Sequence, residues 1–249
     1  MAVTMSAAAS AQPEPMSEVA RLTGVVWSPG TTFRDIATRP RWWPPLAIIV
    51  VLSLVFTYFF GQRVGYERFY RQQIETSSRT QNLDAPQREQ IIQTQAKYGP
   101  VFFYAFSIVG TPLMALVVAA IFLFVYRTFL GAEISFRQVY AICCYSFVPL
   151  IFSSIMAFIV MQLKDPDQFD LQNPTLTNAG AFLDALNTPK WLYSLASSFD
   201  VFTFWTLALL ATGLSAAARK TSWSTSIACV LATWAVWVLL KMGLAAAFS

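Results

Sequence analysis

Two ionisable side chains, Asp200 and Lys241, interrupt segments that are otherwise apolar and uncharged. An ionisable group inside a membrane-length apolar segment is costly to bury alone, so each is a candidate for a functional role. A structural role is also open for both. The long side chain of Lys241 can reach toward a polar interface, and Asp200 can cap a helix that begins at Val201.

The sequence also predicts that these two charges form a pair. The apolar segments 191–218 and 221–248 are joined by a turn at 219–222, so helices formed by them must be adjacent and antiparallel. Asp200 and Lys241 both lie about 20 residues from the centre of that turn, which corresponds to about 30 Å along a helix. We therefore expect them at equal depth, as a candidate intramembrane charge pair.

Two prolines, Pro112 and Pro149, lie inside other long apolar segments. Proline inside a helix removes one backbone hydrogen bond and frees a carbonyl about one turn earlier. Both residues are therefore candidate helix kinks. A pair of kinks could line a cavity or act as a hinge, and the alternative is a static bend that neighbouring side chains satisfy.

Residue types needed for common enzyme chemistry are missing. The chain has no histidine, which excludes a Ser-His-Asp triad and an HExxH zinc motif. Cys143 and Cys144 are adjacent and Cys229 stands alone, without the spacing of metal ligands. The sequence also lacks the GxxxxGK[ST] phosphate loop and the GxGxxG motif. We expect no catalytic residue, no metal and no cofactor, and hence a protein that is not an enzyme.

Composition indicates a membrane protein. Of 249 residues, 56% are apolar and only 12% are charged, about half the charged fraction typical of soluble domains. Apolar runs of about 20 residues suffice to cross a bilayer as helices. The predicted fold is all-α and polytopic, with five transmembrane helices over 42–62, 98–126, 138–163, 191–218 and 221–248.

The remaining segments have recognisable helix signals. Residues 1–16 read as a disordered tail, and 42–249 as the transmembrane domain. Between them, Ser17 can cap a first short helix, and the turn residues at 28–30 precede a second. We expect 17–41 to lie on the cytoplasmic membrane surface, with Arg34, Arg39 and Arg41 as a basic anchor. A solvated linker is the alternative for 17–41. Asp84, followed by Pro86, predicts another helix start that leads into the second span.

Orientation follows from the placement of Lys and Arg near the spans. Basic residues before the first span, at 127–137 and at 219–220 favour a cytoplasmic N-terminus and an external C-terminus. The loop 63–97 is the exception, with six basic residues accompanied by four acidic ones. The net charge of +4 is too small for a dense nucleic-acid-binding surface, so we expect no nucleic acid partner.

Four short stretches together resemble the bacterial branch of the Yip-domain proteins, a family named for eukaryotic Ypt/Rab-interacting proteins. The stretches are SPGTTFR at 28–34 with WWPP at 42–45, FRQV at 136–139 with YSFVP at 145–149, DVFTFW at 200–205 with LLATGLS at 209–215, and a late span with Trp234 and Trp237. The layout covers nearly the whole chain beyond about residue 20.

The resemblance implies a cytoplasmic N-terminus and a scaffold role in membranes. Its eukaryotic members engage small GTPases, but this chain lacks their long N-terminal cytoplasmic region, so we expect no GTPase partner. We expect a non-enzymatic multi-pass scaffold in the bacterial inner (plasma) membrane. Its partners would be the lipid bilayer and other membrane proteins or a second copy, through small-residue faces. These faces contain Ala208, Thr212 and Ala216, and Ala228 with Ala232. A transporter or channel subunit kinked at Pro112 and Pro149 is the alternative function, although five spans do not divide into an inverted repeat.

Overall fold

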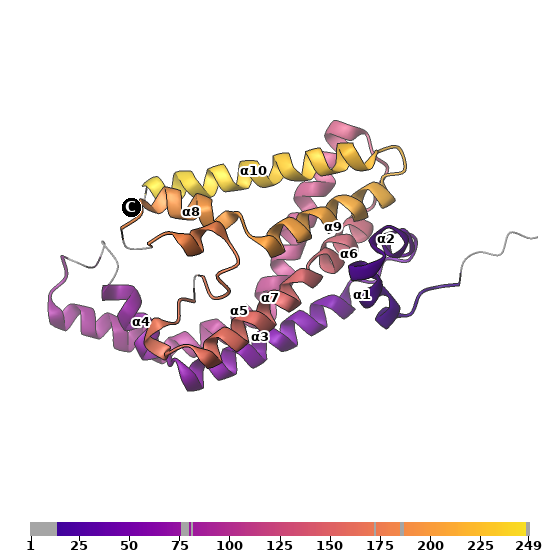
Figure 1. Cartoon of the computed structure of the whole chain (residues 1–249). Helices are drawn as coiled ribbons and strands as arrows, with labels where there is room; N and C mark the ends of the chain where they lie inside the picture. The colour runs from indigo at the N-terminus through magenta and orange to yellow at the C-terminus, as the bar shows by residue number, and fades with distance from the viewer. Residues whose placement is uncertain (1–13, 76–79, 81, 172, 185–186, 248–249) are drawn as a thin grey trace, which may run out of the picture.

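The helices of this chain form an elongated bundle (Figure 1). A computed structural model describes residues 14–75, 80, 82–171, 173–184 and 187–247. The tail predicted over 1–16 therefore lies outside the described residues, except for its last three. In chain order the elements are α1 (Glu18–Trp27), α2 (Pro29–Thr38), α3 (Trp43–Arg63), α4 (Tyr66–Glu75), α5 (Ala85–Leu130), α6 (Phe136–Ser146), α7 (Val148–Leu163), the 3₁₀ turns η2 (Pro166–Gln168) and η3 (Ala179–Phe182), α8 (Lys190–Ser198), α9 (Val201–Ala217) and α10 (Trp223–Ala247).

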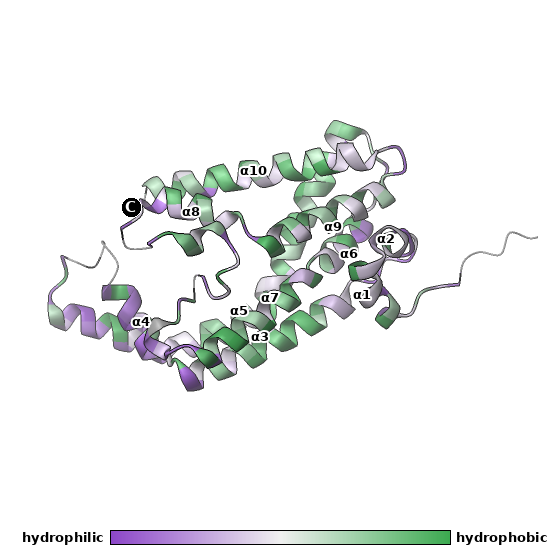
Figure 2. Ribbon diagram, in the orientation of Figure 1, coloured by the Kyte–Doolittle hydropathy of each residue, from purple (hydrophilic) through white to green (hydrophobic). Residues whose placement is uncertain are grey.

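Among the described residues, four apolar stretches are long enough to cross a membrane: α3, α5, α6 continued by α7, and α10. Figure 2 shows the hydrophobic colouring along these helices. The sequence predicted five spans, and the predicted span without a membrane-length helix is the fourth. The predicted 191–218 helix is interrupted before Val201, which leaves α8 and the 17-residue apolar helix α9. Asp200 causes the interruption, because its carboxylate caps α9 by accepting the Thr203 N–H at 3.0 Å.

Pro149 and Pro112 lie in different settings. Pro149 falls in the first turn of α7, where its missing N–H leaves no helical bond unmade. The chain turns there at Phe147, whose carbonyl accepts the Leu150 N–H at 2.9 Å, so the third span consists of two helices. Pro112 lies within α5, which is assigned as one helix of 46 residues that also contains Pro100.

Helices α3, α5 and α7 pack together along one side of the bundle. Thr57 of α3 and Ser107 of α5 share a buried hydrogen bond of 2.7 Å. Nearby, the buried ring of Phe60 stacks on Phe103 with centroids 5.4 Å apart. Arg63 ends α3 by donating from Nε to the Met161 carbonyl of α7 at 2.9 Å. Polar contacts thus join helices whose outward surfaces are apolar.

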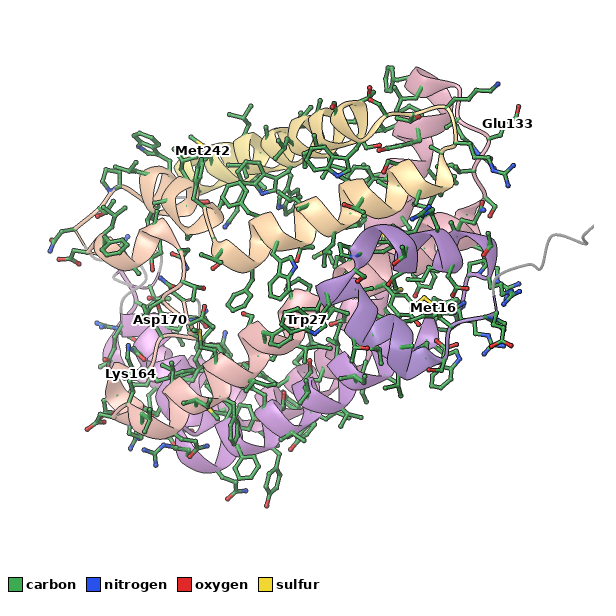
Figure 3. All side chains as sticks on the ribbon, turned by 45° about the vertical axis from the view of Figure 1, so that its right-hand side comes forward. Met16, Trp27, Glu133, Lys164, Asp170 and Met242 are labelled. Carbon is green, nitrogen blue, oxygen red and sulfur yellow. The ribbon has the colours of Figure 1, made fainter. Side chains whose placement is uncertain are left out.

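The bundle has two distinct ends. One end holds the N-terminal helical hairpin of α1 and α2, the α5–α6 loop and the α9–α10 turn, and we call it the hairpin end (Figure 1). The opposite end, which we call the far end, holds α4, the loop after α7, and α8. Figure 3 labels Met16 and Glu133 toward the first end, and Lys164 and Asp170 toward the second. The chain therefore passes between the two ends in α3, α5, α6–α7 and α10, whereas α9 begins part-way along the bundle, after α8, and runs to the hairpin end (Figure 1).

Candidate functional site

The N-terminal hairpin, α1 and α2, is held to the bundle by a buried charged network. The Arg21 side chain is only 2% exposed, and its Nε donates to Asp35 Oδ2 of α2 at 2.7 Å. Its Nη1 lies 3.5 Å from Glu18 Oε1. Glu18 also accepts a hydrogen bond of 2.7 Å from the Tyr145 hydroxyl of α6. Arg41 completes the network with an ion pair of 3.1 Å to Glu18. We call these five residues the hairpin network.

The charges in the hairpin network balance, with two guanidinium groups facing two carboxylates. Burial alone would lower the pKa of Arg21, but the hydrogen bond to Asp35 and the negative charges of Asp35 and Glu18 outweigh it. The pKa of Arg21 is therefore raised above its ordinary value. Arg21 therefore stays protonated throughout the physiological pH range and keeps its positive charge toward Asp35 and Glu18.

Local sequence determines which side of α1 is buried. Arg21 and Val25 are four residues apart and form its buried side, while Val19 and Trp27 are 71% and 83% exposed. The Ser17 hydroxyl accepts the Ala20 N–H at 3.2 Å and begins the helix there, as predicted. Ser28 then separates α1 from α2.

Apolar packing positions the hairpin. Phe33 and Ile36 of α2 are fully buried in the main core together with Val25, Ile142 and Leu214. Gly213 permits this close approach. A methyl group at Gly213 would collide with Ile142 and would lie 2.8 Å from Phe33 Cδ1. The segments α2, α6 and α9 therefore meet at Gly213, where the Phe33 and Ile142 side chains pack directly on the backbone of α9.

This site can position groups but offers little reactive chemistry. Its carboxylates are occupied by guanidinium and hydroxyl donors, and it has no imidazole. Within the described ranges, no group of three or more His, Cys, Asp or Glu side chains has the arrangement of a metal site. A hollow of about 270 Å³ lies at the same end, lined by Glu133 of the α5–α6 loop, Gln138 of α6, and Arg219 and Lys220 of the α9–α10 turn, among others.

The predicted pair of Asp200 and Lys241 has a different environment from the one expected. Asp200 Oδ2 accepts a hydrogen bond of 2.5 Å from the Thr177 hydroxyl, in addition to its capping bond. Lys241 Nζ lies 3.5 Å from Ser198 Oγ, two residues before Asp200. Lys241 therefore lies near the C-terminal end of α8, and the equal depth expected for the two charges stays a prediction. Both belong to the described residues, and no ion pair joins them there, so the capping alternative fits Asp200 and the direct pair stays a prediction.

The predicted basic anchor lies around the hairpin network. Arg34 is exposed on α2 and bonds through Nε to the Gly30 carbonyl at 3.1 Å. Arg39 is exposed just after α2, and Arg41 belongs to the hairpin network. The structure therefore places all three at the hairpin end but gives them three different environments.

The central residues of the hairpin network were not predicted as site residues. Tyr145 is 127 positions from Glu18, and no spacing rule connects them. The available signal was the helical spacing of Arg21 and Val25, which puts an arginine on the same face as an apolar residue. That pattern indicates a buried arginine, and a buried arginine requires acidic partners.

Comparisons with known proteins agree with this architecture. The family model described as Yip1 domain matches residues 23–245. The membrane protein YknW of Bacillus subtilis is 26% identical over 214 residues, which cover 85% of each chain. No solved structure matches.

Proposed function

The chain belongs to the Yip1 domain family, and from this membership we propose that it is a non-enzymatic scaffold of the bacterial inner membrane. In this role it would organise lipids or partner proteins without transforming a substrate. The observation that carries the proposal is the hairpin network. Five side chains from the hairpin, the segment before α3, and α6 fix a structured surface at one end of a multi-pass bundle.

The proposed topology has five spans, with the N-terminus in the cytoplasm and the C-terminus outside. The additional span, fourth in chain order, is α9, whose 17 residues extend for about 26 Å, slightly less than a hydrocarbon core of about 30 Å. Because α8 follows the outer part of α10, the broken unit of α8 and α9 can complete the crossing.

Charge placement supports this orientation. At the far end, Arg68 pairs with Asp167 at 3.0 Å, and Arg71 pairs with Glu89 at 2.9 Å. At the hairpin end, five exposed basic residues form no ion pair among the described residues: Arg34, Arg39, Arg137, Arg219 and Lys220. Unneutralised positive charge beside the spans favours the cytoplasmic side.

Protein contacts are proposed on α10. The small-residue face of α9 is partly covered by its own neighbour, since Trp223 Nε1 of α10 donates to the Thr212 hydroxyl at 3.2 Å. Ala228 and Ala232, one turn apart on α10, are exposed. Small residues one turn apart let another helix approach closely in a membrane, so this face suits another membrane protein or a second copy.

Affinity purification in mild detergent, followed by partner identification and crosslinking, tests the scaffold proposal. We expect one reproducible partner protein, or a crosslinked second copy, whose yield falls when Ala228 and Ala232 are both replaced by Leu. The matched control replaces the exposed Leu239 and Leu240 of the same helix by Ala, which leaves the small-residue face intact. Purification of a lone monomer under crosslinking would contradict the proposal.

Transport is the second candidate function. Its specific support is that two apolar units are broken, at Phe147 between α6 and α7 and at Asp200 between α8 and α9. Broken helices at membrane depth occur where solutes or ions are bound. Solute or ion flux across liposomes that contain the purified protein, absent from empty liposomes, would favour this function over the scaffold.

A further inference from the structure

Three aromatic rings form a row at the hairpin end, where α3 and α6 both begin. Trp42 lies beside Tyr140 with ring centroids 5.5 Å apart. Tyr140 stacks on Phe136 with centroids 5.8 Å apart and ring planes within 10°. Trp42 and Phe136 are each about two-fifths exposed, so the row is open to the surroundings. We call Trp42, Tyr140 and Phe136 the aromatic row.

Two arginines lie close in sequence to the residues that join α2 to α6, at the same end as the aromatic row. The Gln138 side chain donates from Nε2 to the Ala37 carbonyl at 2.9 Å, which joins the start of α6 to the end of α2. Arg137 is adjacent to Gln138 in sequence and Arg39 follows Ala37 by two residues, so both belong to the segments that meet at this contact. Both arginines are exposed. Within the described residues, neither guanidinium has an acidic partner.

Neighbouring acids do not neutralise these two charges. Glu18 and Asp35 are engaged by Arg21 and Arg41 inside the hairpin network. Glu133 is the acid nearest to Arg137 along the chain, and it is exposed on the α5–α6 loop. Two exposed guanidinium groups on the segments that carry the aromatic row therefore remain available for an anion.

We propose that Arg39 and Arg137 bind the phosphate of an anionic phospholipid whose glycerol and upper acyl chains lie along the aromatic row. Guanidinium groups match phosphate geometry with two parallel hydrogen bonds, and aromatic rings favour the boundary between headgroups and hydrocarbon. A free phosphate would use the same arginines but would gain nothing from the rings. The assignment rests on the proposed function, which places this end against the cytoplasmic leaflet.

The test counts lipid adducts on the purified full-length protein by native mass spectrometry in mild detergent. Phosphatidylglycerol and phosphatidylcholine are supplied at equal concentration, with and without millimolar inorganic phosphate. The test variant is Arg39→Gln with Arg137→Gln. The matched control is Arg34→Gln with Arg219→Gln, which removes the same charge from the same end but leaves Arg39 and Arg137 in place. Because the arginines are exposed, we expect equal thermal stability for the three proteins.

The expected result is preferential retention of phosphatidylglycerol that falls about tenfold in the test variant and changes little in the control. Equal loss in both variants would show a diffuse charge effect and overturn the site. Equal retention of the two lipids would also overturn it. Displacement of phosphatidylglycerol by inorganic phosphate would overturn the lipid assignment in favour of a free anion. The assay needs neither a partner protein nor a known orientation, so its failure is distinguishable from failure of the scaffold proposal.

Discussion

Arg21 shows how one residue can determine the placement of a whole segment. Removing a guanidinium from water is costly, and only the two carboxylates at hand, Glu18 and Asp35, offset that cost. One of these acids precedes Arg21 on α1 and the other lies on α2. The ion cluster can therefore form only when the two helices fold back on each other, and the hydroxyl of Tyr145 then ties the folded hairpin to α6.

The first prediction concerns Arg21→Met. This change leaves the partly buried Asp35 carboxylate without its ion-pair partner and removes one of the two cations beside Glu18, so we expect a loss of about 3 kcal/mol in stability. Thermal aggregation in mild detergent measures it. The control is Arg34→Met on α2, which is exposed and should change little. Equal effects of the two changes would contradict a buried role for Arg21.

The second prediction concerns Asp200, for which the structure favours capping. We expect Asp200→Ala to cost about 1 kcal/mol and Asp200→Asn much less, because asparagine caps helices as well as aspartate does. Lys241→Met should add its own effect independently in the double variant. A double variant with Asp200→Asn that is more stable than either single variant would instead establish the direct pair with Lys241.

At the scale of helices, packing distances matter more than hydropathy. The main core needs α2, α6 and α9 to approach one another at Gly213, and no side chain fits there. Elsewhere, the hydroxyl pair of Thr57 and Ser107 joins α3 to α5. In a membrane, apolar surface alone does not select a neighbour, so close approach and interhelical hydrogen bonds determine which helices pair.

The third prediction is that Gly213→Val displaces the hairpin. The added side chain would collide with Ile142 and Phe33, and overpacking of this kind costs about 1–3 kcal/mol. A cysteine in place of the buried Val25 reports the displacement, because it should react with maleimide only when the hairpin opens. Gly243→Val is the control, since no atom lies within 4 Å of a methyl group built at Gly243. Similar labelling in both variants would mean that Gly213 does not position the hairpin.

At the scale of the molecule, orientation is the property that most needs measurement. The fourth prediction is that residues 1–41, 127–137 and 218–222 face the cytoplasm. Cysteines at Asn82 and Asn178 should then react with an impermeant maleimide in intact cells. Asn82 is exposed and is the more sensitive site, whereas Asn178 donates a hydrogen bond of 2.6 Å to Asn173. Reaction only after lysis would reverse the proposed topology.

The fifth prediction concerns the basic anchor as a unit. Each basic residue near an anionic leaflet contributes about 1 kcal/mol to membrane attraction. Replacement of Arg34, Arg39 and Arg41 by Glu should therefore invert a fraction of the molecules or lower the membrane yield, as the same labelling assay would show. Replacement by Lys keeps the charge and is the control. Unchanged orientation and abundance in the Glu variant would show that these charges are merely solvated.

Sequence reasoning predicted local features better than distant ones. The helix starts at Ser17 and Asp84 were predicted because a cap and its helix are adjacent in sequence, and the structure confirms both. The long apolar segments were predicted because membrane-length hydrophobicity is a property of one stretch. The contact between Tyr145 and Glu18 depends on how separate helices pack, so no local pattern contains it. The break at Asp200 was expected only as an alternative, since a single aspartate can either pair or cap.

The length of α5 has a consequence for anything that touches the far end. Its 46 residues extend for about 69 Å, more than twice the thickness of a hydrocarbon core. The polar first turns of α5, together with α4, therefore project beyond the bilayer surface by a distance that the length of the helix fixes. Seven residues inserted near Gln90 would lengthen this projecting part of α5 by about 10 Å and would rotate its end only slightly about the helix axis. A partner that binds this projecting part of α5 must present its binding surface at that height. The length of α5 would therefore set the distance between the membrane and such a partner.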